Sequence, residues 1–205
     1  WFLWLPLLAF VTYCLVEFRF FTMEYPNRNF NSWERLLTQG PVVTDYLNKL
    51  LLPRLHGSGL YFDNFPASRS LIQPWSTLVC WGVLAALLAA AWHLRQRLPL
   101  FAFGIFFYVS GHLMESTVVP LELYFEHRNY LPQVGVWLAL VALLDLITNT
   151  RIQKVMALAA LLLVVLLSMM TRHSADLWGK PELQTSVWYH DNPGSLRTTL
   201  AYADL

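Results

Sequence analysis

The chain has 205 residues, of which 56% are hydrophobic and only 13% are charged. Soluble domains carry about 25% charged residues, so this composition, with its apolar residues gathered in blocks, excludes an ordinary soluble domain and favours a polytopic membrane protein. A formal net charge of +1 gives no electrostatic basis for binding nucleic acid. Cys14 and Cys80 lie inside apolar blocks, where packing is a better explanation than a disulfide or metal pair.

Apolar blocks predict an all-α membrane domain over residues 1–171 with about five transmembrane helices. The predicted spans are residues 1–17, 74–94, 98–118, 130–148 and 155–171. The first is shorter than the about 20 residues that a span needs, and the chain opens with Trp1 inside an apolar run. We therefore expect this sequence to be a piece of a longer protein.

The connection at residues 18–73 has mixed character. Ser32 is a suitable N-cap, and apolar residues recur beyond it at helical spacing. Because Gly40 and Pro41 interrupt the pattern, we predict two short amphipathic helices, at residues 33–39 and 41–52. Such helices lie along a membrane surface or pack against the other helices of the same protein.

Two short basic segments indicate the orientation. The sequences RQR (residues 95–97) and RIQK (residues 151–154) fall on one side if the spans alternate, and short basic loops mark the cytoplasmic side. The connection at residues 18–73, the segment at 111–132 and the tail at 172–205 then lie on the opposite side. In a bacterium this is the periplasm, so we expect a multi-pass inner-membrane protein with a periplasmic C-terminus.

The polar tail at residues 172–205 predicts two helices. Pro181 opens the first, which runs through Tyr189, and Asp191 to Gly194 form a turn. Ser195 caps the second helix, at residues 196–205. The pattern resembles the start of a tetratricopeptide array, in which about three or more repeats are needed to bury the apolar faces.

The segment from Gly111 to Pro132 is too charged for lipid and too apolar for an ordinary solvated loop. Ionisable groups beside membrane helices are costly, which makes a functional role the default hypothesis. The candidate residues are His112, Glu115, Glu122, Glu126, His127, Arg128 and Tyr130. A structural salt-bridge network that joins two spans is the alternative.

Spacing divides this segment at Pro120. Helical periodicity puts His112 and Glu115 on one face before it, and Glu122 and Glu126 on one face of a short surface helix after it. Arg128 is the natural cation for either of the latter two carboxylates, or for an anionic ligand such as a lipid phosphate.

Other chemistry-bearing motifs are missing from the sequence. It has no Gly-rich phosphate loop, no zinc-ligand spacing and no Gly-x-Ser-x-Gly motif, so we expect no metal and no cofactor. Asp45 and Asp63 are interpreted as ordinary helix-surface and loop acids.

Three segments carry a resemblance to a known family. ERLLTQGPVVTDYLNKLLLPR, DNFPASRSLIQP and above all HLMESTVVPLELYFEHRNYLPQVG resemble bacterial membrane proteins that combine a multispan domain with periplasmic tetratricopeptide repeats. These are similar to the animal transmembrane-and-TPR O-mannosyltransferases, which have the GT-C glycosyltransferase architecture. The resemblance covers residues 30–205 and is most specific at FEHRNYLP.

The resemblance implies a membrane glycosyltransferase that moves a sugar from a polyprenyl-phosphate carrier to a periplasmic acceptor. The residues that match family elements are Glu126, Arg128, Tyr130 and Pro132, with Glu115 and Ser116 before them. In that reading Arg128 contacts the lipid phosphate, and His127 and Tyr130 bond to phosphate or sugar. Glu122 and Glu126 orient Arg128 or place the acceptor hydroxyl.

The family's catalytic acid lies in the first non-cytoplasmic loop, and this chain has no counterpart, so we expect it upstream of Trp1. The expected partners are membrane lipids, a lipid-linked sugar, and a protein acceptor or a larger membrane complex. Two other functions stay open: a non-enzymatic anchoring or assembly subunit, and an O-antigen ligase or polymerase.

Overall fold

A computed structural model describes residues 28–53, 62, 64–113, 115–116 and 121–205, together with residues 8, 9 and 12. The regular structure of these residues is helical, which confirms the predicted all-α class. The elements are α2 (Ser32–Leu51), α3 (Ser76–Leu94), α4 (Pro99–Leu113), the 3₁₀ helix η2 (Glu126–Asn129), α5 (Gln133–Leu144), α6 (Thr150–Trp178), α7 (Pro181–Asp191) and α8 (Leu196–Ala203). The predicted span at residues 1–17 lies almost entirely outside the described residues.

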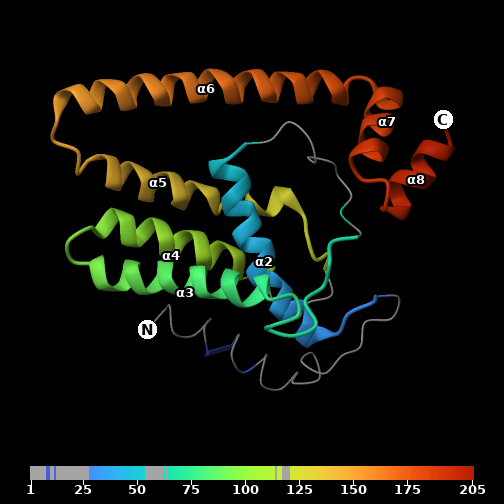
Figure 1. The fold of residues 1–205 in the computed structure, drawn as a ribbon, viewed down its shortest axis with the longest axis horizontal. Helices are drawn as coiled ribbons and strands as arrows, with labels where there is room; N and C mark the ends of the chain where they lie inside the picture. The colour runs from blue at the N-terminus through green and yellow to red at the C-terminus, as the bar shows by residue number, and fades with distance from the viewer. Residues whose placement is uncertain are drawn as a thin grey trace.

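Helices α3 to α6 run in alternating directions across the view, and α2 crosses α3, α4 and α5 near one end (Figure 1). The two basic segments, at residues 95–97 and 151–154, both lie at the other end of the helices. Helix α2, η2, α7 and α8 all lie at the end opposite these basic segments. The chain is therefore polarised, with its charged site candidates gathered at one end.

Helices α3 and α6 are long and apolar enough to cross a membrane. Their 19 and 29 residues correspond to about 28 and about 43 Å, against a hydrocarbon core of about 30 Å. The apolar part of α6 is not buried anywhere within the chain, so α6 does not resemble the core helix of a soluble protein. Helix α6 also continues through residues 172–178, which were predicted to belong to a separate polar tail.

The predicted spans at residues 98–118 and 130–148 correspond to shorter apolar helices, α4 with 15 residues and α5 with 12. The five predicted spans are thus not confirmed. The two shorter helices pack closely, because a Cβ atom on Gly104 would lie 2.3 Å from the carbonyl oxygen of Gly135. Only glycine at both positions lets the two backbones touch.

Helix α2 is one continuous helix, so the predicted break at Gly40 and Pro41 is wrong. Pro41 has no backbone N–H and leaves the carbonyl of Leu37 without its usual helical partner. The indole of Trp81 on α3 supplies the missing donor, with Nε1 lying 3.0 Å from that carbonyl oxygen. Gly40 leaves room for the indole, since a Cβ atom there would lie 2.6 Å from Trp81 Nε1.

The ends of the amphipathic and C-terminal helices follow capping rules. Asn31, rather than the predicted Ser32, is the N-cap of α2, and its side chain forms a capping box with Glu34. Helices α7 and α8 form the predicted C-terminal pair, with Pro181 in the first turn of α7. Ser195 caps α8 by accepting from the backbone N–H of Thr198.

Candidate functional site

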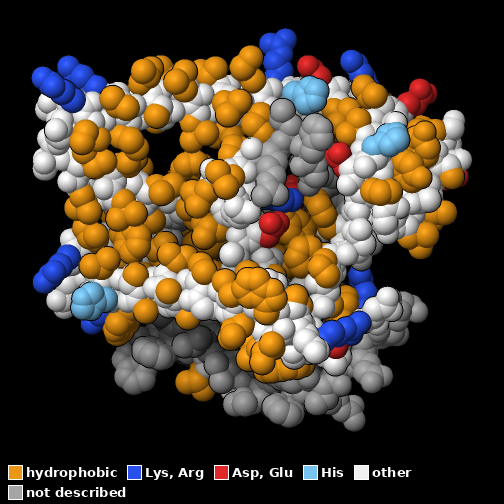
Figure 2. Space-filling view, in the orientation of Figure 1, with side chains coloured by type: hydrophobic (Ala, Val, Ile, Leu, Met, Phe, Trp, Pro, Cys, Tyr) orange, Lys and Arg blue, Asp and Glu red, His pale blue; other side chains and the backbone are white. Residues whose placement is uncertain are grey.

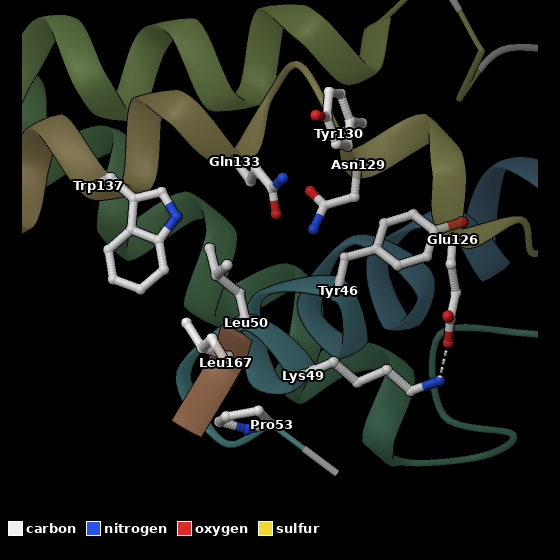
Figure 3. Close-up of a pocket in the computed structure, with 10 residues that line it drawn as sticks. All are labelled: Tyr46, Lys49, Leu50, Pro53, Glu126, Asn129, Tyr130, Gln133, Trp137 and Leu167. Atoms are coloured by element: carbon white, nitrogen blue, oxygen red, sulfur yellow. Dashed lines mark hydrogen bonds and ion pairs between the residues drawn. The ribbon is translucent and has the colours of Figure 1, made fainter. Parts of the chain in front are cut away.

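A pocket of about 230 Å³ lies where α2, η2, α5 and α6 meet (Figure 3). Ten residues from these elements and the segments next to them line the pocket. They are Tyr46, Lys49, Leu50, Pro53, Glu126, Asn129, Tyr130, Gln133, Trp137 and Leu167. Because α5 and α6 are apolar and α2 is amphipathic, the pocket joins an apolar part of the chain to its polar end.

Lys49 and Glu126 form an ion pair at the polar end of the pocket (Figure 3). Their side chains stay 25% and 33% exposed, so both reach solvent. The Lys49 ammonium also lies 4.9 and 5.0 Å from the ring centres of Phe62 and Tyr124, where the negative ring faces attract a cation. Lys49 is therefore fixed in place while it remains accessible to a ligand.

The other end of the pocket is apolar. Trp137 of α5, Leu50 of α2 and Leu167 of α6 gather there, whereas Asn129 and Gln133 point their amides into the space between the two ends (Figure 3). A hollow between α5 and α6 is rimmed by hydrophobic side chains (Figure 2). The pocket can thus accept a molecule that has both a polar and an apolar part.

Arg35 organises the polypeptide beside the pocket. Its side chain is completely buried, and its guanidinium donates to the carbonyl oxygens of Leu121 at 2.5 Å, Glu115 at 3.1 Å and Glu122 at 3.4 Å. A buried cation needs such partners. Glu115, Leu121 and Glu122 are consequently held against α2 by their backbone carbonyls.

Tyr46 fixes the next part of this segment. Its hydroxyl donates to the carbonyl of Phe125 at 2.9 Å and accepts from the N–H of the same residue at 2.8 Å. Burial raises the pKa of Tyr46 to about 12. Burial, followed by the hydrogen bond to Asp45, also raises the pKa of Tyr124 above its usual range. Both hydroxyls stay protonated at neutral pH and keep donating.

His112 supports the pocket from behind and does not line it. The ring is buried, is stacked on Tyr46 at 5.5 Å and meets the edge of Tyr108 at 4.9 Å. Its Nε2 lies 3.3 Å from Oδ1 of Asn129, which is a pocket residue. His112 therefore connects α4 to η2, and its predicted pairing on one helical face with Glu115 is not formed, since α4 ends at Leu113.

Arg128 pairs with Glu115, not with the carboxylates of Glu122 or Glu126 as predicted. Its Nε lies 2.7 Å from Glu115 Oε2, and its Nη1 donates to the Glu122 carbonyl at 2.7 Å. The side chain is only 11% exposed. The predicted helical face fails because Phe125 is extended, so Glu122 and Glu126 do not lie on successive turns of one helix.

Glu122 faces away from the pocket and connects distant segments. Its carboxylate lies 3.3 Å from Arg28 and 2.7 Å from Arg197 of α8. Burial raises the pKa of Glu122, but the two guanidinium groups outweigh this effect and hold it below its usual value. His127 is exposed and rests against the ring of Phe125 at 4.2 Å, so neither residue reaches the pocket.

Glu126 and Tyr130 are the two predicted site residues that line the pocket, and Tyr130 is 79% exposed. Lys49 was missed in the sequence, although its spacing from Tyr46 and Leu50 places all three on one helical face. No local signal links this face to Asn129, Gln133 or Trp137. Among the described residues, no three His, Cys, Asp or Glu side chains gather as a metal site.

Comparison of the chain with protein-family models, with curated proteins and with solved structures finds no match.

Proposed function

We propose that the chain is part of a GT-C-type membrane glycosyltransferase that uses a polyprenyl-phosphate-linked sugar. The observation that carries the proposal is the two-ended pocket, with Lys49 and Glu126 at one end and the Trp137 side at the other. A lipid-linked sugar has the same division, with a phosphate and sugar joined to a long apolar chain. The pocket also includes a residue of α6, which is long and apolar enough to span a membrane.

Lys49 is the phosphate ligand in this proposal, in place of Arg128. Arg128 is enclosed and already holds Glu115 and a backbone carbonyl. Lys49 is partly exposed at the edge of the pocket, where a phosphate can replace its Glu126 partner. An ammonium suits this exchange because it acts as a compact point charge. The prenyl chain then extends past Trp137 into the hollow between α5 and α6 (Figure 2).

Transfer of the sugar needs a group that stabilises the negative charge developing on the phosphate and a base that accepts a proton. The acceptor hydroxyl oxygen bonds to the anomeric carbon of the sugar, while the bond from that carbon to the phosphate oxygen breaks and its electron pair stays on the phosphate. Lys49 balances the charge that develops there. Glu126, released from Lys49 by the phosphate, is placed to accept the hydroxyl proton.

The proposal also includes the direction in which the chain crosses the membrane and the compartment that the pocket faces. The basic segments that share one end of the helices face the cytoplasm, following the positive-inside rule. The pocket, α7 and α8 then face the periplasm of a bacterial inner membrane. The α7–α8 pair begins a tetratricopeptide-like region that presents the acceptor.

A photoreactive polyprenyl phosphate provides the test, with the full chain reconstituted in liposomes. Lys49→Met is expected to reduce crosslinking about tenfold, since a charged hydrogen bond contributes about 1.5–3 kcal/mol. Arg69→Met is the matched control, because Arg69 is an exposed cation that pairs with Glu34 and lies outside the pocket. A photoreactive polyprenol without the phosphate should crosslink weakly to every variant. Equal crosslinking of Lys49→Met and the wild type refutes the proposal.

An anchoring or assembly subunit is the second candidate. It is favoured by the internal bonding of Arg35 and Arg128 and of the Glu122 carboxylate, which makes a structural network of most of the charged segment. Copurification of the chain with the same partner proteins from wild-type and Lys49→Met cells, without any lipid-phosphate crosslink, supports this alternative.

A further inference from the structure

A second pocket, of about 460 Å³, lies on the other side of α2. It is formed by α2, the segment at residues 65–74 and the start of α3. Its lining residues are Pro41, Thr44, Asp45, Asn48, Phe65, Pro66, Ser68, Pro74, Ser76 and Cys80. Ligand pockets of about 300–1,000 Å³ are typical of small-molecule sites, so the space suffices for one or two sugar rings.

Helix α2 is the wall between the two pockets. Positions 41, 44, 45 and 48 line the second pocket, and positions 46, 49, 50 and 53 line the first. The first set follows the i, i+3, i+4, i+7 spacing of one helical face, and positions 46, 49 and 50 share another face, whereas Pro53 lies just beyond the end of α2. At about 100° per residue the centres of the two faces are about 140° apart. The second pocket is therefore a separate site, not an extension of the lipid pocket.

Asp45 places an accessible acceptor in the second pocket. The Tyr124 hydroxyl donates to Asp45 Oδ2 at 2.7 Å, and the Lys49 ammonium lies 4.0 Å from the same oxygen. Among the described residues no hydrogen bond is formed to Oδ1. Since Lys49 already balances the charge of Asp45, the site calls for a hydrogen-bond donor more than for a cation.

Thr44 has an unusual hydroxyl group. Threonine and serine in helices commonly bond to the carbonyl four residues earlier, as Thr38, Ser168 and Thr171 do in this chain. The Oγ1 atom of Thr44 is buried and has no partner among the described residues. A buried hydroxyl without a partner beside a pocket indicates a group that arrives with a ligand.

The remaining lining fits a ring with hydroxyl groups. Asn48 and Ser76 add a carboxamide and a hydroxyl, which can both donate and accept. Phe65 and Pro66 present flat apolar faces, which match the C–H faces of a sugar ring. With one balanced charge and several neutral polar groups, the lining favours a neutral, hydroxyl-rich ligand.

We infer that this second pocket binds the sugar ring of a neutral carbohydrate, with Asp45 accepting from its hydroxyl groups and Thr44 and Asn48 completing the contacts. The inference goes beyond the proposed function and does not depend on it, because the two pockets share no lining residue. Asp45 lies 4.0 Å from the Lys49 ammonium, so Thr44→Val is the variant that separates the two proposals. It should weaken sugar protection and leave lipid-phosphate crosslinking unchanged.

Cys80 provides the assay because it lines the pocket as a free thiol. In a Cys14→Ser background it is the sole cysteine of the chain, and its modification by a water-soluble methanethiosulfonate is followed in detergent. The probes are glucose, mannose and N-acetylglucosamine, with ethanolamine as a cationic comparison. A bound sugar at about ten times its dissociation constant should slow the modification about tenfold.

Asp45→Asn keeps the shape of the side chain but removes the carboxylate, so it should weaken the protecting sugar about tenfold or more. Asp176→Asn on α6 is the matched control and should keep full protection. If the rate of Cys80 modification without sugar is the same in Asp45→Asn as in the wild type, the pocket of the variant is still folded. If that rate differs, Thr44→Val takes the place of Asp45→Asn as the test variant. Absence of protection by all three sugars, protection by ethanolamine alone, or sugar protection that survives both substitutions overturns the inference.

Discussion

The bond between Trp81 and the carbonyl of Leu37 predicts a specific coupling between two helices. Trp81→Phe removes the Nε1 donor that lies 3.0 Å from this carbonyl, and Pro41 has no N–H to replace it. A hydrogen bond of this kind contributes about 1 kcal/mol, and an acceptor left unpaired costs up to about 3 kcal/mol. In a chain of 205 residues, 1 kcal/mol shifts the melting temperature by about 2–4 °C. We expect Trp81→Phe to lower it by about 4 °C.

Pro41→Ala should reduce the loss of stability that Trp81→Phe causes. Alanine restores a backbone N–H that bonds to Leu37 within the helix, so Trp81→Phe no longer leaves the carbonyl unpaired. The coupling energy expected between the two positions is about 1 kcal/mol, within the range for residues that share a bonding partner. Trp92→Phe makes the same chemical change at the exposed end of α3 and should cost less than about 0.5 kcal/mol.

The assay is thermal unfolding followed by circular dichroism at 222 nm, in one detergent and at one heating rate. Five samples suffice: the wild type, the two single variants Trp81→Phe and Pro41→Ala, the double variant, and the Trp92→Phe control. If Trp81→Phe costs the same with proline and with alanine at position 41, the indole does not replace the missing helical donor. That result would refute our explanation of the continuous α2.

Three further predictions concern the rest of the fold. Arg35→Met leaves three carbonyls without their buried donor and should cost about 3 kcal/mol or more of unfolding free energy, measured by the same thermal assay. Gly104→Ala forces a Cβ atom to within 2.3 Å of the Gly135 carbonyl and should cost about 1–3 kcal/mol, whereas Gly82→Ala meets nothing within 4 Å and should stabilise by about 0.5–1 kcal/mol. The pKa of Glu122 is lowered from 4.5, so its ion pairs stabilise the fold fully above that pH and are lost as the pH falls through the lowered value. Amide hydrogen exchange in α8 should therefore become faster below about pH 4.5 in the wild type. In Glu122→Gln it should already be fast at about pH 7.

The sequence predicts the elements whose signals are local. The apolar blocks of α3 and α6 are continuous, so their existence follows from composition alone. Pro181 and Ser195 lie where capping rules put helix starts, and α7 and α8 begin beside them. These predictions need no knowledge of the rest of the chain.

The failures of prediction have a common physical cause, which is a partner far away in the sequence. A proline inside a helix is normally a break, and nothing near Pro41 reveals that Trp81 compensates for it 40 positions later. Lys49 and Glu126 are separated by 77 positions, so helical spacing cannot pair them. Local periodicity instead paired Glu122 with Glu126, because it assumed a helix through Phe125, whose backbone is extended.

The cations of this region have two different roles: Arg35 and Arg128 hold the polypeptide together, and Lys49 can bind a ligand. Arg35 and Arg128 are 0% and 11% exposed and bind carbonyl oxygens and Glu115, so an incoming phosphate would have to break several bonds in a closed space. Lys49 lies against two aromatic rings and pairs with Glu126 at the edge of a pocket, so a phosphate can reach it by replacing the Glu126 carboxylate. The buried Arg35 and Arg128 therefore build the site, and the partly exposed pair of Lys49 and Glu126 is the part that can exchange a partner for a ligand.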